Sequence, residues 1–262
     1  MNRFIILLLL ICVALGETRK WDAHSAYLIP PKQWELGLFQ PFRYGYRDGA
    51  ELSTHPLWFF VLPNLSIKKS HSSRNGFARA MQYDFVYPTP FLNMVAKKGI
   101  MGIISPEFQM PPMVGLSATG LMSKDLAGIN TTLKGGVDLG LVFGDLDKRS
   151  TIDFPMVYHR LGVYYNGYGF HVGLDAQKFL TPNINLIGDI DYRLLPGLDG
   201  DYSIEHKALV AWHKSDNFRV MTGYKFVVGA YPFGTQANLL PYIPMMEKWI
   251  PVIEFQWSGK KS

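Results

Sequence analysis

The sequence predicts an all-β protein: a single antiparallel, up-and-down transmembrane β-barrel of about 10–12 strands, preceded by a cleavable signal peptide. Apolar and polar side chains alternate over stretches of roughly 9 to 15 residues, the period of a β-strand. No stretch after the signal approaches the roughly 18 consecutive apolar residues of a spanning helix. The chain is nevertheless rich in aromatic residues, at 14%. A closed barrel is the remaining way for such a chain to cross a membrane.

The first sixteen residues have the layout of a secretory signal peptide. Arg3 precedes an apolar run, and the small residue Gly16 stands just before Glu17. We therefore expect cleavage between Gly16 and Glu17. Residues 1–16 are the predicted signal, and residues 17–262 form one predicted barrel domain.

Charge and cysteine content narrow the possible partners. Removing Arg3 from the 26 basic residues leaves 25 against 21 acidic residues, a net charge of +4. These charges are spread along the chain, which disfavours a nucleic-acid partner. The only cysteine, Cys12, lies in the predicted signal, and the seven histidines show no metal-ligand spacing. The sequence predicts no metal and no cofactor.

The strands follow in order along the chain. Alternation is clearest in residues 129–143, 170–177, 184–193, 202–212 and 218–228, and further strands are expected at 34–46, from 50 onward, at 77–87, at 113–122 and at 249–257. Tight turns are expected at Asp48-Gly49, Asn75-Gly76, Asn166-Gly167 and Ser215-Asp216. Prolines interrupt residues 91–112, which we interpret as a loop or a bulged strand. For residues 232–244, the sequence is compatible with a loop, a short strand or an inward fold. Counting these two stretches as loops or as strands gives ten or twelve strands.

The apolar faces carry aromatic residues near their ends, as Tyr168, Trp212 and Trp257 illustrate. Tyrosine and tryptophan favour the boundary between lipid headgroups and hydrocarbon. Predicted strands of about 9–11 residues also suit a bilayer better than an average soluble sheet. The alternative is a soluble sheet whose aromatic residues face a core, because alternation alone does not separate core from lipid.

Two segments resemble parts of uncharacterised bacterial outer-membrane β-barrel proteins. The stretch WELGLFQP at 34–41, followed by Arg43-Tyr44-Gly45 and by ELSTHP at 51–56, is similar to their opening hairpin. The strand at 249–257 resembles the C-terminal strand that the barrel-assembly machinery recognises during insertion, although Ser258 to Ser262 follow it here. The resemblance implies an outer-membrane location, lipid and the assembly machinery as partners, and no particular activity.

Charged side chains of both signs occupy the polar faces of the predicted strands. We expect them to line the lumen, because a basic side chain facing lipid near mid-membrane costs about 2–4 kcal/mol. The predicted lumen-lining residues are Lys134, Asp138, His171, Asp175, Asp189, Asp191, Arg193, Glu205, Lys207, Arg219 and Lys225. These groups can line a narrow pore or pair across the lumen and close it.

One strand carries residues from which a catalytic site can be built. Glu51, Ser53 and His55 alternate and point the same way. They are a carboxylate, a nucleophile and a base, the groups of a serine hydrolase. Any three alternate polar residues of a strand share a face, however, and His55 before Pro56 also suits a bend.

Three functions are therefore compatible with the sequence. The leading hypothesis is an outer-membrane barrel that acts as a small channel or as a structural envelope protein, without catalysis. The second is a barrel hydrolase of envelope lipids, such as a lipid A deacylase or phospholipase, using Ser53 and His55. The third is a soluble secreted β-barrel that binds a small apolar ligand and turns its aromatic faces inward.

Overall fold

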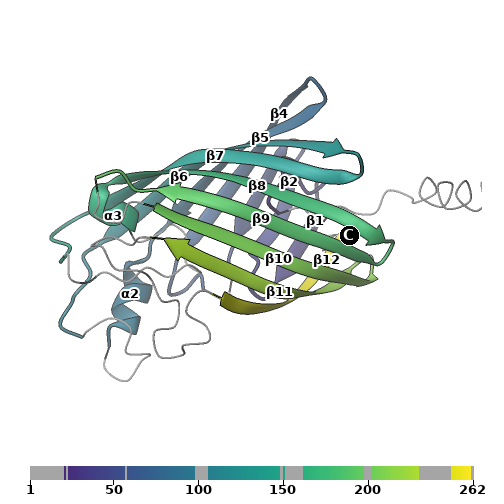
Figure 1. Ribbon diagram of the computed structural model, residues 1–262. Coiled ribbons are helices and arrows are strands. Elements are labelled where there is room, and N and C mark those ends of the chain that lie inside the picture. The colour runs from purple at the N-terminus through teal and green to yellow at the C-terminus, as the bar shows by residue number, and fades with distance from the viewer. Residues whose placement is uncertain are drawn as a thin grey trace, which may run out of the picture.

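Twelve strands close into one antiparallel barrel in the part of the chain that the computed structural model describes, residues 21, 23–56, 58–97, 106–147, 150, 162–197, 202–229 and 249–260 (Figure 1). Each strand pairs with its sequence neighbours, and β1 pairs with β12 to close the wall. The strands are β1 Gln33–Gly37, β2 Phe42–Arg47, β3 Ala50–Thr54, β4 Asn64–Arg74, β5 Phe77–Val86, β6 Met113–Leu126, β7 Ile129–Val142, β8 Tyr168–Thr181, β9 Ile184–Leu194, β10 Tyr202–Ser215, β11 Phe218–Gly229 and β12 Trp249–Lys260. The all-β, closed antiparallel fold is confirmed, with the larger of the two strand counts.

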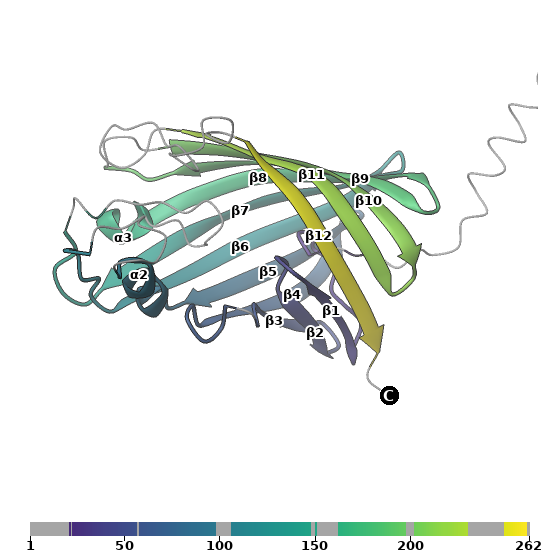
Figure 2. The same ribbon diagram turned by 90° about the horizontal axis from the view of Figure 1, so that it is seen from below.

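The two ends of the barrel differ. At one, here called the turn end, two-residue turns join successive strands, as at Asp48-Gly49 and Asn75-Gly76. Asn75 and Gly76 both have positive φ, which suits a tight hairpin. The other, the loop end, carries the longer connections, including helices α2 Thr89–Val95 and α3 Gly162–Asn166. Both helices lie at that end in Figures 1 and 2.

Alternation places apolar side chains outside the wall and charged ones inside. In β7, Leu133 is 53% exposed and Leu139 43%, whereas Asp138 is 4% exposed. A soluble domain of this size would bury such leucines in its core. None of the helices among the described residues is long and apolar enough to cross a membrane.

The wall is uneven in height. Strands β6, β7, β8 and β10 have 14 residues each, whereas β1 and β3 have five and β2 has six. Figure 2 shows β12 extending well past the short strands β1 to β3. At about 3.3 Å per residue, five residues span only about 17 Å.

Two predicted elements are wrong. The single strand expected from Trp34 to Tyr46 is two strands, because residues 38–41 turn back and the Glu254 carboxylate accepts hydrogen bonds from the amides of Phe39 and Gln40. Pro41 has no amide hydrogen to continue the ladder.

The hairpin expected at Asn166-Gly167 is the end of α3 instead. Gly167 has φ +88° and donates its amide hydrogen to the Val163 carbonyl, 2.7 Å away. A glycine with positive φ just after the last helical residue is a common helix terminator. The asparagine–glycine pair therefore ends a helix and leads directly into β8.

Other boundaries moved less. The strand expected at 113–122 extends to Leu126, and the turn expected at Ser215-Asp216 lies one residue later. The proline-rich stretch 91–112 begins in α2 rather than in a bulged strand. The predicted signal at 1–16 and the open segment at 232–244 lie outside the described residues.

Candidate functional site in the barrel interior

A lysine at the centre of the wall joins three strands. The ammonium group of Lys134 on β7 lies 2.9 Å from a carboxylate oxygen of Asp175 on β8 and 2.9 Å from one of Asp191 on β9. Gly173 makes this reach possible, since a Cβ there would clash with both Asp191 and the end of the Lys134 side chain. The absence of a side chain at Gly173 thus leaves room for Lys134 to pair with Asp191 across β8.

Neighbouring strands continue the network. The Glu205 carboxylate lies 2.7 Å from the ammonium nitrogen of Lys225 and 3.6 Å from Arg193. Arg193 is also 3.6 Å from Asp138. Such buried charges are tolerated when each has opposite charges close by.

A further ion pair belongs to the same interior. The ammonium of Lys207 on β10 lies 2.8 Å from Asp189 on the adjacent strand β9. The two residues face each other directly in the register of these strands. Opposite charges at such a position stabilise the pairing of the strands.

His171 is held between a carboxylate and a hydroxyl. Its Nδ1 lies 3.0 Å from Asp138 and its Nε2 3.0 Å from the hydroxyl of Thr119. Gly136 stands between Thr119 and His171 in the strand register, and a Cβ there would meet the imidazole ring. A hydroxyl, an imidazole and a carboxylate in this order also form nucleophile relays. Thr119 is only 9% exposed, so we interpret the group as a structural network.

A second cluster, here called the Arg43 cluster, occupies the short strands. The Arg43 guanidinium lies 2.7 Å from Glu35 on β1 and 2.7 Å from Glu51 on β3. Lys68 on β4 lies 3.8 Å from the Glu51 carboxylate. All four side chains are at most 5% exposed. Glu51, named as a catalytic candidate, is thus tied to two buried cations.

The other catalytic candidates have separate surroundings. His55 Nε2 lies 2.7 Å from the Phe39 carbonyl oxygen, and among the described residues no hydrogen bond joins it to Ser53. Burial lowers the pKa of His55, while the Phe39 carbonyl raises it less. No nucleophile, base and carboxylate chain therefore forms from Glu51, Ser53 and His55 in this structure.

The N-terminal segment, residues 21 and 23–31, lies inside the barrel at the turn end. Wall side chains bind its main chain. Ser123 accepts a hydrogen bond from the Ala26 amide at 2.8 Å, Glu51 accepts one from Ile29 at 3.0 Å, Lys68 donates to the Ser25 carbonyl at 3.0 Å, and Arg219 donates to the Trp21 carbonyl at 3.3 Å. Gly45 lets the segment pass, because a Cβ there would clash with the carbonyl of Pro30.

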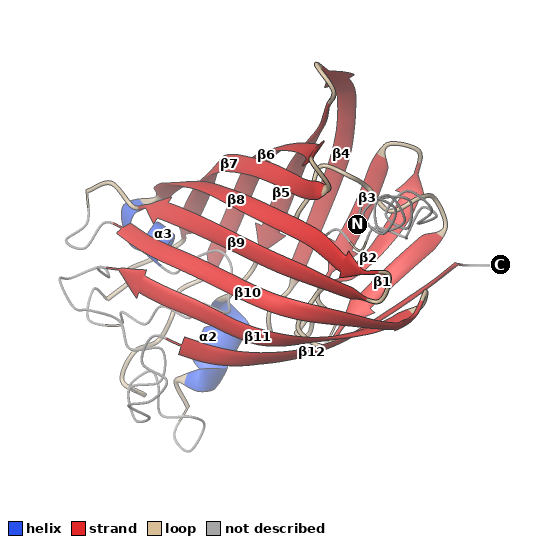
Figure 3. Cartoon of the chain, turned by 45° about the vertical axis from the view of Figure 1, so that its right-hand side comes forward, coloured by secondary structure: helices blue, strands red, loops and turns tan. Residues whose placement is uncertain are grey.

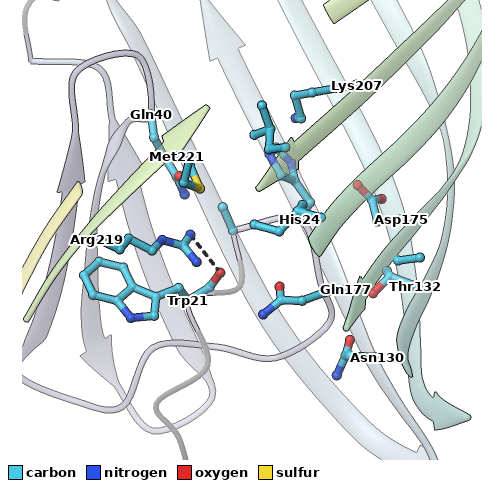
Figure 4. A pocket seen from close by; sticks show the side chains of 14 residues that line it. Trp21, His24, Gln40, Asn130, Thr132, Asp175, Gln177, Lys207, Arg219 and Met221 are labelled. Carbon is cyan, nitrogen blue, oxygen red and sulfur yellow. Dashed lines mark hydrogen bonds between the residues drawn. The ribbon is translucent and has the colours of Figure 1, made fainter. Parts of the chain in front are cut away.

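A small cavity of about 70 Å³ separates this segment from the wall (Figure 4). Trp21 and His24 line it from the segment, and Asp175, Lys207 and Arg219 from β8, β10 and β11. Burial lowers the pKa of His24 well below its ordinary value, and the charges of Lys207, Lys134, Arg43 and Lys68 lower it further.

The loop end carries an apolar group of side chains, here called the α2 cluster. Phe91, Leu92 and Val95 of α2 pack with Val86 at the end of β5 and with Tyr164 of α3. Leu92 is 1% exposed and Val95 is fully buried. Trp58, from the β3–β4 connection, lies edge-on against Phe91 with ring centroids 5.9 Å apart. Burial and the nearby Asp138 carboxylate raise the pKa of Tyr164.

Ten of the eleven residues predicted to line the lumen come together in the ion pairs and hydrogen bonds above: Lys134, Asp138, His171, Asp175, Asp189, Asp191, Arg193, Glu205, Lys207 and Lys225. Arg219 lies apart and donates a hydrogen bond to the Gln256 side chain at 2.7 Å. No cluster of three or more potential metal ligands is found in the described ranges.

Sequence reasoning missed the Arg43 cluster and the N-terminal segment. Alternation alone could have revealed the cluster, because Glu35 alternates with Trp34 and Leu36. The N-terminal segment has no periodic signal. No protein-family model matches the sequence, and no curated protein is significantly similar to it.

Proposed function

We propose that the chain is an integral barrel of the bacterial outer membrane, with a charged interior that acts as a small channel. One observation carries this proposal: the closed wall exposes its apolar side chains and turns its charges inward. Phe170, Trp212 and Trp249 are 45%, 50% and 48% exposed. That distribution suits lipid surroundings and is the reverse of a soluble barrel with an apolar ligand site.

The asymmetry of the two ends supports the same assignment. Outer-membrane barrels have short turns on the periplasmic side and longer loops outside. By this rule the turn end, where β1 begins and β12 ends, faces the periplasm. Membrane lipid and the barrel-assembly machinery are then the expected partners.

The barrel interior favours a narrow path for small polar solutes over an open pore. Lys134, Asp175 and Asp191 form one compact ion-pair group, and Lys225 with Glu205 forms another. Paired charges fill space, yet they also present polar groups to a passing ion. The engagement of Glu51 with Arg43 offers no support for the hydrolase alternative.

The test is the conductance of refolded residues 17–262 in planar bilayers. Lys134→Gln, Asp189→Asn and Arg219→Gln should each change the size or ion preference of discrete conductance steps. Asp216→Asn, on an exposed turn, is the matched control and should leave them unchanged. Slower migration of the heated than of the unheated protein in detergent gels verifies folding. A folded, inserted protein that never conducts would exclude the channel.

A further inference from the structure

Hydrogen bonds join wall side chains to the main chain of the N-terminal segment. Ser123, Glu51, Lys68 and Arg219 supply them from β6, β3, β4 and β11. Three of these four bonds involve a charged side chain and are stronger than neutral ones, yet each can be exchanged for a bond to water when the segment leaves.

Each of these wall groups has a second partner within the wall. The Ser123 hydroxyl lies 2.7 Å from that of Thr132, Glu51 is bound to Arg43 and lies close to Lys68, and Arg219 donates to Gln256. Departure of the segment would therefore leave no wall charge without a protein neighbour. The penalty that normally locks a buried polar contact in place is reduced here.

Apolar side chains also hold the segment, since Trp21 and Ile29 are only 3% and 5% exposed. Its Ala26 and Leu28 contact a small patch of the wall formed by Ala78, Ala80 and Leu121. The guanidinium carbon of Arg219 lies over the Trp21 ring, 4.8 Å from the ring centroid. Burial stabilises roughly in proportion to area, so the buried Trp21 contributes more than Ala26 does.

The cavity beside the segment is polar and holds about 70 Å³. That volume has room for water, because a cavity needs only about 10–15 Å³ of this kind of space to hold one molecule. Figure 4 shows His24, Gln177 and Asp175 around it, with Arg219 bonded to the Trp21 carbonyl. Water in this cavity has access to one of the contacts that would break, the bond between Arg219 and Trp21.

From these contacts we infer that the N-terminal segment is a displaceable plug, which closes the channel at the turn end while it is seated and opens it when it leaves. The inference rests on the proposed channel function. The plug continues directly into β1. At the junction, Lys32 donates its amide hydrogen to the Gly45 carbonyl of β2 at 2.8 Å. Pro30 and Pro31 stiffen this junction.

His24 makes the seated plug sensitive to acid. The cations Lys207, Lys134, Arg43 and Lys68 act on its imidazole, and Asp175 and Arg219 also line its cavity. The pKa of His24 in the seated state is below its ordinary 6.5, so the neutral form favours seating. That contribution is fully present above pH 6.5 and is lost as pH falls toward the lowered pKa. Acid should therefore raise the open fraction, and His24→Gln should remove that dependence.

The decisive experiment locks the plug with a disulfide. Residues 17–262 contain no cysteine, so Ala26→Cys with Ser123→Cys introduces one pair, where the Ala26 amide lies 2.8 Å from the Ser123 hydroxyl. The matched control, Ser123→Cys with Thr132→Cys, forms a disulfide within the wall and leaves the plug free.

Oxidation of the plug pair should lower the frequency of openings at least tenfold, and reduction should restore it. The wall pair should conduct equally in both states. Equal opening frequency of the plug pair before and after reduction, with the disulfide verified, would overturn the plug.

A labelling experiment separates failure of the plug from failure of the channel. Ala26 is 3% exposed, so a thiol in Ala26→Cys reacts with a membrane-impermeant maleimide only when the plug leaves. Its rate, divided by that of the exposed turn variant Asp216→Cys, should rise severalfold between pH 7.5 and 5.5. If the thiol is labelled in a protein that never conducts, the segment is mobile but the channel proposal is wrong. A thiol that stays unlabelled while the Asp216→Cys control reacts would show a permanent seal.

Discussion

The two ends of the barrel are held by different contacts. At the turn end, Ser123 and Glu51 accept hydrogen bonds from the N-terminal segment and Lys68 donates one to it, while Trp21 and Ala26 of the segment are buried. At the loop end, the α2 cluster buries Leu92 and Val95 almost completely. Figure 3 draws α2 and α3 in blue in its left half, on the side of the strands away from the C-terminus.

On the plug inference, this difference is that between a contact that can be broken and a permanent one. Hydrogen bonds can be exchanged for water at little net cost, whereas displaced apolar side chains lose their burial outright. We therefore expect the stability of the turn end to depend on the Arg43 cluster of the wall. The stability of the loop end should depend on the α2 cluster.

The largest effect should come from Glu51→Gln. It removes the carboxylate that Arg43 and Lys68 share, and breaking such a buried pair costs about 3–5 kcal/mol. Urea unfolding of the barrel refolded in lipid vesicles measures the loss. Asp216→Asn, on an exposed turn, should stay within about 0.5 kcal/mol. A loss below about 1 kcal/mol for Glu51→Gln would mean that the wall at the turn end does not depend on this cluster.

Next is Leu92→Ala, which opens a cavity in the α2 cluster. Removal of a fully buried leucine side chain lowers the free energy of unfolding by about 2–5 kcal/mol, and Leu92 is 1% exposed. The same urea titration measures it, with Phe60→Ala as the control because Phe60 is 89% exposed. Opening frequency should not change. A variant that instead opens more often would show that the loop end also gates.

The smallest and most selective effect comes from two glycines, one at each end. A Cβ at Gly45 would clash with the Pro30 carbonyl of the plug, and one at Gly140 with the Val163 carbonyl of α3. Each alanine variant should lose about 1–3 kcal/mol of stability through overpacking. Only Gly45→Ala should increase single-channel openings, because only it pushes on the plug. Equal openings in the two variants would contradict the distinction between the ends.

The strand pattern and the inward placement of the charges were readable from the sequence, because alternation is a local property of consecutive residues. The stretch from Leu133 to Leu139 shows it, with Lys134 and Asp138 at the intervening positions. Hairpin turns with strong local preferences, such as Asn75-Gly76, were readable for the same reason. The role of Gly167 was not readable, because a glycine with positive φ can either form a hairpin turn or end a helix. Only the presence of α3 before it decides that it ends a helix.

What the tertiary structure alone decided are the contacts between residues far apart in sequence. Lys134 meets Asp191 57 residues away, and Phe39 binds Glu254 215 residues away, which splits the expected first strand. The N-terminal segment has no period of its own, so nothing local predicts where it lies. Its place depends on a wall of strands already closed around it, with Gly45 leaving room and Ser123 offering a bond. Local periodicity therefore determines the strands and their faces, and closure of the barrel decides what fills it.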